Sequence, residues 1–181
     1  RDPGLLSQGE LWPERIIEIQ PTGLTSGQIV WEWRVWDHVI QDHDPTKPNY
    51  GTVSDHPELV DLNHYSGAQP VADWLHFNAI DWNPALDQIV VSSRTFDEIW
   101  IIDHSTSTAE AASHSGGNSG QGGDLLYRWG NPSTYRRGTN ADHQLFGQHN
   151  PEWIPPGRPG AGNITLFNNG TGRPGYPRST I

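Results

Sequence analysis

The sequence has 181 residues, a formal net charge of −10, and neither cysteine nor methionine. The absence of cysteine excludes a disulfide framework, a thiolate metal site and a cysteine nucleophile. The 11 Lys and Arg residues are outnumbered by 21 Asp and Glu residues, and no apolar stretch approaches the ~20 residues of a membrane helix. We therefore expect no nucleic acid and no membrane as partners. Because a reading frame begins with methionine and this chain begins with Arg1, we expect a trimmed protein or a fragment.

The composition favours short strands joined by turns. The chain contains nine Trp, 20 Gly and 15 Pro, and only 33% of its residues are hydrophobic, which is low for a large helical core. Residues 15–19 and 28–33 are predicted to form a first hairpin. In its second strand, Ile29, Trp31 and Trp33 recur at every other position, a pattern typical of a strand with one buried face.

Residues 37–72 interrupt this pattern with a long connection rich in His and Asp. Long connections within compact domains are usually functional or covering elements. Candidate metal ligands within it are His38, His43, Asp44, Asp55, His56 and His64. Because their spacing matches no closed metal site, we favour a solvated polar loop and expect no metal and no other cofactor.

Four further strands are predicted in the second half of the chain. They are residues 88–93, 98–103, 124–130 and 162–167. Residues 104–123 are rich in Ser, Gly and Ala, which predicts an exposed, flexible loop. No segment has the pattern of a long amphipathic helix.

The strands repeat along the chain. The hairpin whose strands end near Ile19 and Trp33 is echoed by strands that end at Asp103 and Trp129, with the Ser/Gly-rich loop taking up the difference in length. Repeated units of short antiparallel strands predict an all-β fold of the β-propeller type, with a single β-sandwich as the alternative. Propellers close with 4 to 8 blades, so residues 1–181 are expected to hold only a partial set.

Ligands of propellers bind where the inner strands converge, and four polar residues lie there in the predicted repeat. His76 and Asn78 precede one inner strand, His149 precedes the next, and Arg94 ends a strand. Imidazoles and a guanidinium in one place favour a small anion, and a neutral imidazole is a competent nucleophile. The alternatives are that His76 only caps a turn and that Arg94 forms an ion pair with the acids at positions 97 and 98.

Several of these segments together resemble the bacterial arylsulfate sulfotransferases. The resemblance extends from about Trp12 to Gly170. It is carried by residues 74–81, 89–94, 98–103, 147–150 and 162–170. The combination of His-x-Asn, an Arg eighteen residues later (94 − 76 = 18), a Gln-His pair and a strand ending in Asn-Gly is far more specific than any single motif.

The resemblance implies a six-bladed propeller that moves a sulfuryl group from an aryl sulfate to a phenolic acceptor, without a nucleotide sulfate donor. In that reading His149 is the nucleophile, which carries the group as a sulfohistidine, and His76, Asn78 and Arg94 hold the sulfate oxygens. A further histidine of the family, from an earlier blade, has no counterpart here, so the site of this piece is incomplete.

Family resemblance also implies a periplasmic or secreted protein and is compatible with a homodimer. Its small-molecule partners would be an aryl sulfate and a phenol. The rival hypothesis is a propeller that serves as a non-catalytic binding or scaffold module, because fold alone does not determine function.

Overall fold

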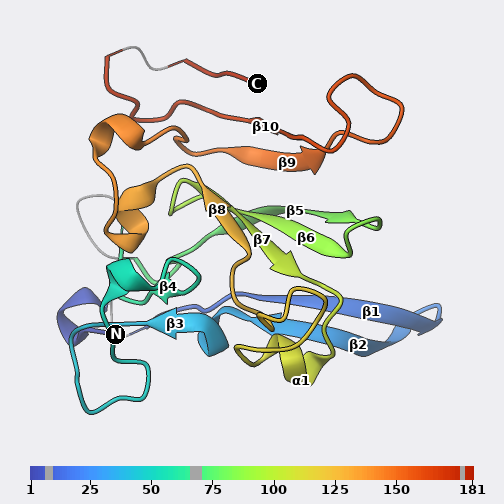
Figure 1. Ribbon diagram of the computed structural model, residues 1–181, viewed down its shortest axis with the longest axis horizontal. Helices are drawn as coiled ribbons and strands as arrows, with labels where there is room; N and C mark the ends of the chain where they lie inside the picture. Colours follow the sequence, from blue (N-terminus) through green and yellow to red (C-terminus); the bar gives the residue numbers. More distant parts are fainter. Residues whose placement is uncertain (7–9, 66–70, 176–177) are drawn as a thin grey trace.

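Figure 1 shows a computed structural model of the chain, which describes residues 1–6, 10–65, 71–175 and 178–181. The strands are β1 (Arg15–Gly23), β2 (Ser26–Arg34), β3 (Val39–Ile40), β4 (Val60–Asp61), β5 (Phe77–Asn83), β6 (Gln88–Ser93), β7 (Glu98–Asp103), β8 (Tyr127–Trp129), β9 (His149–Trp153) and β10 (Ile164–Phe167). The helical elements are α1 (Thr108–Ala111) and the 3-10 turns η1 (Pro3–Leu5), η2 (Val35–His38), η3 (Val53–Asp55), η4 (Pro132–Tyr135) and η5 (Asn140–Asp142). The predominance of strand confirms the all-β prediction, and no helix within the described ranges has the length and apolarity to cross a membrane.

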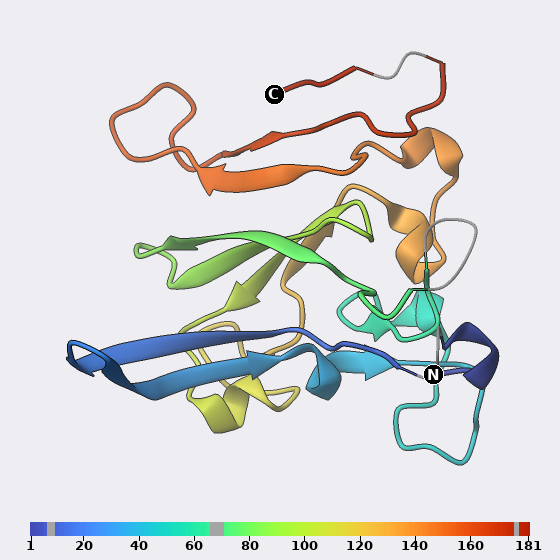
Figure 2. The same cartoon turned by 180° about the vertical axis from the view of Figure 1, so that it is seen from behind.

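The larger strands form three antiparallel layers in chain order. The β1–β2 hairpin is the first layer, the meander β5-β6-β7-β8 is the second, and the β9–β10 pair is the third. Figures 1 and 2 show the three layers one above another, with the short parallel pair β3–β4 beside the first. The described residues form no closed ring of sheets, so the fold establishes a layered all-β arrangement and leaves the propeller as a hypothesis.

The central sheet is buried because it has a layer on each side. Nearly every residue of β6 and β7 is buried, in agreement with their continuous apolar runs at Ile89–Val91 and Ile99–Ile102. The main hydrophobic cluster joins this sheet to the first hairpin and includes the fully buried Trp33, Trp74 and Trp100. Large aromatic side chains therefore supply most of the apolar surface that holds the first two layers together.

The first hairpin follows the predicted alternation only over part of its length. Trp31 and Trp33 are buried, whereas Ile29, two residues before Trp31, is 47% exposed. The tip of the hairpin extends beyond the central sheet (Figure 1), and a register shift separates Glu18 from Ile19. The shift pairs Ile29 with Ile19, on the face opposite that of Glu18 and Trp31, so the bulge interrupts the alternation and turns Ile29 outward.

Residues 104–123 differ from the exposed loop that their composition predicts. Helix α1 lies within them and begins with a capping box formed by Ser107 and Glu110. Trp31 Nε1 donates a hydrogen bond to the buried Thr106 over 3.1 Å. Small side chains allow this segment to approach the first hairpin closely, so part of it packs as a covering element.

Residues 37–72 also contain more regular structure than a solvated loop. They include the end of η2, η3 and the β3–β4 pair, and residues 66–70 lie outside the described part of the chain. The predicted strand 124–130 is regular only over Tyr127–Trp129, and the strand predicted over 162–167 covers Ile164–Phe167.

Candidate functional site

The residues predicted to bind sulfate lie at one end of the β5–β6 pair. His76 immediately precedes β5, Asn78 is the second residue of β5, and Arg94 immediately follows β6. The backbone N–H of Arg94 donates to the His76 carbonyl oxygen over 3.1 Å. The antiparallel ladder therefore holds these three residues at the same edge of the central sheet.

The predicted nucleophile reaches this edge from the third layer. His149 is the first residue of β9, and its Nδ1 atom lies 3.0 Å from Asn78 Nδ2. Asn78 Nδ2 also donates to the Gln148 carbonyl oxygen over 2.9 Å. The structure thus brings Asn78 and His149 into direct contact across two sheets.

The contact also indicates the tautomer of His149. The Gln148 carbonyl oxygen can only accept, so the atom of the Asn78 amide that faces it is the donor nitrogen. The same nitrogen faces His149 Nδ1, which then accepts, and the proton of a neutral ring lies on Nε2. In this tautomer Nε2 can donate its N–H to a ligand, and it becomes a nucleophile only when the ring proton moves to Nδ1.

Irregular backbone shapes both halves of the site. The β5–β6 ladder has a register shift at Asn78, between the pairs Phe77–Ser93 and Ala79–Ser92, and the β9–β10 ladder has one just after His149. Such bulges redirect side chains. His76 and Asn150 have φ values of 51° and 53°, a conformation uncommon for residues other than glycine that clusters at functional sites.

The two histidines do not occupy equivalent positions in their ladders. His149 is paired with Phe167 within the β9–β10 ladder, whereas His76 lies just outside the ladder that β5 forms with β6. The sequence repeat suggested equivalent places for them. This difference corrects that expectation, since the bulges shift each strand by one residue in a way that similarity of short strands does not reveal.

Gln148 is a positioning residue that the sequence did not single out. Its side chain is fully buried, and its Nε2 atom donates toward Ser92 Oγ (3.1 Å), the Ser93 carbonyl (3.0 Å) and the Glu98 carbonyl (2.8 Å). These bonds anchor the residue before His149 onto β6 and β7. The Gln-His pair was visible as part of a motif, but its burial could not be read from one sequence.

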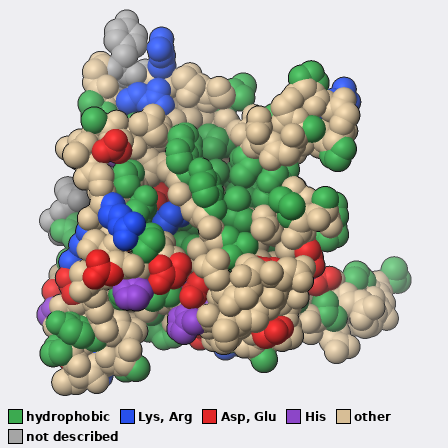
Figure 3. Space-filling model, in the orientation of Figure 1, with side chains coloured by type: hydrophobic (Ala, Val, Ile, Leu, Met, Phe, Trp, Pro, Cys, Tyr) green, Lys and Arg blue, Asp and Glu red, His purple; other side chains and the backbone are tan. Residues whose placement is uncertain are grey.

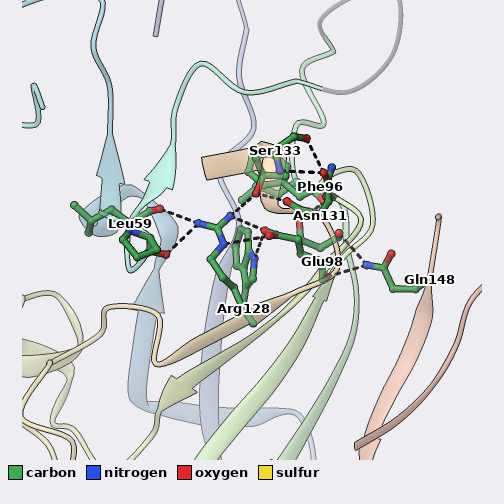
Figure 4. A network of polar contacts seen from close by, with 12 residues as sticks. Leu59, Phe96, Glu98, Arg128, Asn131, Ser133 and Gln148 are labelled. Carbon is green, nitrogen blue, oxygen red and sulfur yellow. Dashed lines mark hydrogen bonds and ion pairs between the residues drawn. The ribbon is translucent and has the colours of Figure 1, made fainter. Parts of the chain in front are cut away.

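The anchor of Gln148 rests on a buried ion pair. Figure 4 shows Arg128 from β8 meeting Glu98 from β7, and their side chains are only 4% and 0% exposed. Arg128 also donates to the carbonyl oxygen of Leu59 (3.0 Å) and to Thr134 Oγ1 (2.8 Å). The Glu98 carboxylate accepts a further bond from the indole of Trp100 (2.8 Å). Every charged atom of the pair is thus hydrogen-bonded, as burial requires.

Arg94 has no ionic partner among the residues that the structure describes. A β-carbon built on Gly147 would lie 3.9 Å from Arg94 Nη2, so the guanidinium lies beside the loop that precedes His149. Asp97 instead pairs with His143, and Glu98 pairs with Arg128. Within the ranges that the structure describes, the ion pair considered as the alternative for Arg94 does not form.

His76 is only half-buried, and it has a carboxylate partner. Its Nδ1 atom contacts the Asp73 carboxylate, with 46% of the His76 side chain exposed. This contact orients the ring and offsets part of the positive charge expected at the site. The structure therefore supports a local role for His76 at the edge of the site and does not bring it into hydrogen-bond contact with His149.

A second carboxyl group near the site was not predicted. Glu14 Oε1 accepts a bond from the N–H of Phe77 over 3.4 Å, and its Oε2 atom is buried without a partner among the described residues. Burial raises the pKa of Glu14, and the nearby charge of Asp73 adds to the increase. A carboxyl with a raised pKa beside a candidate site is a recognised sign of function. The sequence could not indicate it, because Glu14 belongs to no recognisable motif.

The candidate metal ligands of residues 37–72 do not converge as a set. In the described part of the chain, the one group of three close ligand atoms is formed by His38, His114 and Asp124. Of these three, only His38 belongs to residues 37–72, the connection in which candidate metal ligands were identified from the sequence.

Comparison with protein families identifies the chain. A family model described as arylsulfotransferase (ASST) matches residues 10–179. Searches of curated proteins and of solved structures return no match. The family match covers nearly the whole chain, including all four candidate site residues, and supports aryl sulfotransferase activity in general. The chain therefore belongs to the arylsulfotransferase family.

Proposed function

We propose that this chain forms part of the sulfate-transfer site of an aryl sulfotransferase, in which His149 carries the sulfuryl group. The single observation that supports this most strongly is the contact of 3.0 Å between Asn78 Nδ2 and His149 Nδ1. The guanidinium of Arg94, which has no ionic partner in the described part of the chain, lies beside Gly147 in the loop that precedes His149. An oriented imidazole beside an unneutralised cation suits an anionic sulfate ester.

In the first half-reaction, the ring proton of His149 moves from Nε2 to Nδ1, the Nδ1 contact with Asn78 opens, and the lone pair then on Nε2 attacks the sulfur of an aryl sulfate. A nitrogen–sulfur bond forms while the bond between sulfur and the aryl oxygen breaks, and its electron pair goes to the departing oxygen. The proton of the neutral imidazole passes to the phenolate, so phenol leaves and sulfohistidine remains. In the second half-reaction a phenolic acceptor attacks sulfur, and the electron pair and a proton return to the imidazole. The exchange balances without a nucleotide or another cofactor.

The neighbouring groups stabilise the charge that develops. Negative charge grows on the peripheral sulfate oxygens and on the leaving oxygen, so fixed donors and a cation lower the barrier. Arg94 supplies the cation, Asn78 orients His149, and His76 stands at the edge of the site as a further donor. The donor and acceptor are expected to be small phenolic molecules.

The layered arrangement is compatible with a propeller. We propose that the three successive sheets are neighbouring blades, the central one complete and the two others partial. In this arrangement the junction of β5 with β9 faces the central space, where propellers bind ligands. The periplasmic or secreted location and a homodimer remain predictions of the family resemblance.

The test is the mass of the intact protein after mixing with 4-nitrophenyl sulfate. We expect an increase of one SO₃ group, located on His149 by peptide fragmentation, and release of nitrophenolate in the same amount. His149→Ala should abolish both the adduct and the release of nitrophenolate. His56→Ala, which changes an exposed histidine outside the proposed site, should leave both intact. Saturable binding without an adduct would instead support the non-catalytic module.

A further inference from the structure

A cluster of two histidines and one aspartate lies away from the proposed sulfate site. His38 Nδ1 and His114 Nδ1 each lie 2.8 Å from the same atom, Asp124 Oδ1. The three potential ligand atoms lie within 4.8 Å of one another. His38 is the last residue of η2, His114 follows α1, and Asp124 lies ten residues after His114. Only the tertiary structure therefore brings His38 to the other two residues.

The hydrogen bonds of His38 leave a requirement for positive charge. Its Nε2 atom lies 2.8 Å from the Ala111 carbonyl oxygen, and its Nδ1 atom faces the Asp124 carboxylate. Both oxygens only accept hydrogen bonds, whereas a neutral imidazole carries a single N–H. One of the two contacts of this fully buried ring therefore needs a second proton or a cation between the atoms.

A divalent metal meets this requirement in the usual way. Histidine ligands of metals commonly donate their second ring N–H to a backbone carbonyl, which orients the ring, and the Ala111 carbonyl is placed to accept from His38 Nε2. Imidazole nitrogen and carboxylate oxygen are ordinary zinc ligands at about 2.0–2.2 Å. Tetrahedral ligands are then about 3.3 Å apart, so the contacts of 2.8 Å would open slightly.

The cluster combines rigid ligands with access from solvent. The His38 ring stacks parallel to Trp33, with centroids 5.4 Å apart, and a β-carbon on Gly123 would approach its Nε2 atom to 2.6 Å. Asp124 is 9% exposed, whereas the His114 side chain is 63% exposed. His114 also lines a depression of about 920 Å³. Figure 3 shows histidine and acidic side chains gathered on the lower part of this face.

We propose that His38, His114 and Asp124 bind one divalent transition-metal ion of the Zn²⁺ type, with water at the remaining position. The ion would connect η2, at the end of the first hairpin, to the covering segment 104–123. Its role in this proposal is structural, and it is independent of the sulfate chemistry proposed for His149.

The test is the stoichiometry and affinity of Zn²⁺ for the chelator-treated chain, measured by elemental analysis and titration calorimetry. We expect one ion per chain and a rise in Tm when Zn²⁺ is added. His114→Ala, at an exposed position, should weaken binding at least tenfold and abolish the rise in Tm. Asp124→Asn, which preserves shape, should do the same.

The matched control is His56→Ala, which removes another exposed histidine that faces the same depression. It should bind Zn²⁺ within about twofold of the unaltered chain, and Co²⁺ in place of Zn²⁺ should give visible absorption that His114→Ala lacks. Failure of the unaltered chain to bind an ion stoichiometrically would overturn the proposal, as would equal affinity in His114→Ala. A doubly protonated His38 at neutral pH, seen by nuclear magnetic resonance without metal uptake, would also overturn it.

Discussion

The Arg128–Glu98 pair and the Asn78–His149 contact are linked through hydrogen bonds of Gln148. The two regions differ in whether their buried polar atoms have hydrogen-bond partners. Around Arg128 the charged atoms have partners and almost no exposure. Beside His149, the Oδ1 atom of Asn78 is buried without a partner among the described residues. Arg94, whose guanidinium lies beside Gly147, likewise has no ionic partner among these residues. A buried unsatisfied acceptor costs about 1–3 kcal/mol. The first region thus serves stability, and the second keeps groups free for a ligand.

The largest expected effect follows from removing the cation of the satisfied pair. Arg128→Ala should lower the free energy of unfolding by about 3–5 kcal/mol, because Glu98 would remain buried and unpaired. Urea unfolding followed by tryptophan fluorescence measures this. Arg15→Ala is the control, since its pair with Glu32 is at the surface with Arg15 57% exposed, and it should change stability by about 0.5 kcal/mol or less. Equal effects in both variants would contradict the contrast.

Removing the guanidinium of Arg94 should reduce the reaction rate strongly and change the stability little. Arg94→Ala should reduce the rate of nitrophenolate release about 100- to 1000-fold, as for loss of one charge-stabilising donor. Its free energy of unfolding should change by about 0.5 kcal/mol or less. Arg94→Lys should recover only part of the rate, because an ammonium lacks the planar fork of the guanidinium. If Arg94→Ala were less stable but still active, the result would show that Arg94 stabilises the fold and does not act on the sulfate.

A third prediction concerns the stability of the chain at acidic pH. Burial lowers the pKa of His64 to about 4, and the charge of Arg128 adds to the decrease. Between pH 6.5 and 4, His64 is protonated in the unfolded chain but not in the folded chain. The free energy of unfolding therefore falls as the pH falls through this window. The loss is at most on the order of 3 kcal/mol. His64→Phe should reduce this pH dependence in urea unfolding, and an unchanged slope would argue against it.

The smallest effect is expected at Glu14, where the charged form is disfavoured by burial. Because the pKa of Glu14 is raised, its contribution to stability is present at low pH and is lost as the pH rises through the folded pKa. Glu14→Gln should therefore be more stable than the unaltered chain at neutral pH and should differ less from it near pH 4. Parallel thermal melts at the two pH values measure this, and a constant difference would contradict the assignment.

The sequence predicted the parts of this protein that depend on local pattern. Apolar runs located β6 and β7, and the alternation of Trp31 and Trp33 located β2. Local composition misled at residues 104–123, because Ser, Gly and Ala permit both a solvated loop and the close packing that the structure shows. The pattern also could not show that Ile29 would be exposed, since a bulge in the β1–β2 ladder turns it to the opposite face from Trp31.

What the sequence determined by itself is the strand content, the family and the identity of the candidate residues near each strand end. The tertiary structure alone decided which of them meet. Asn78 and His149 are 71 residues apart, Arg128 and Glu98 are 30 apart, and His38 and Asp124 are 86 apart. Such contacts depend on bulges, register and the stacking of layers, and a shift of one residue would turn each side chain to the opposite face of its sheet.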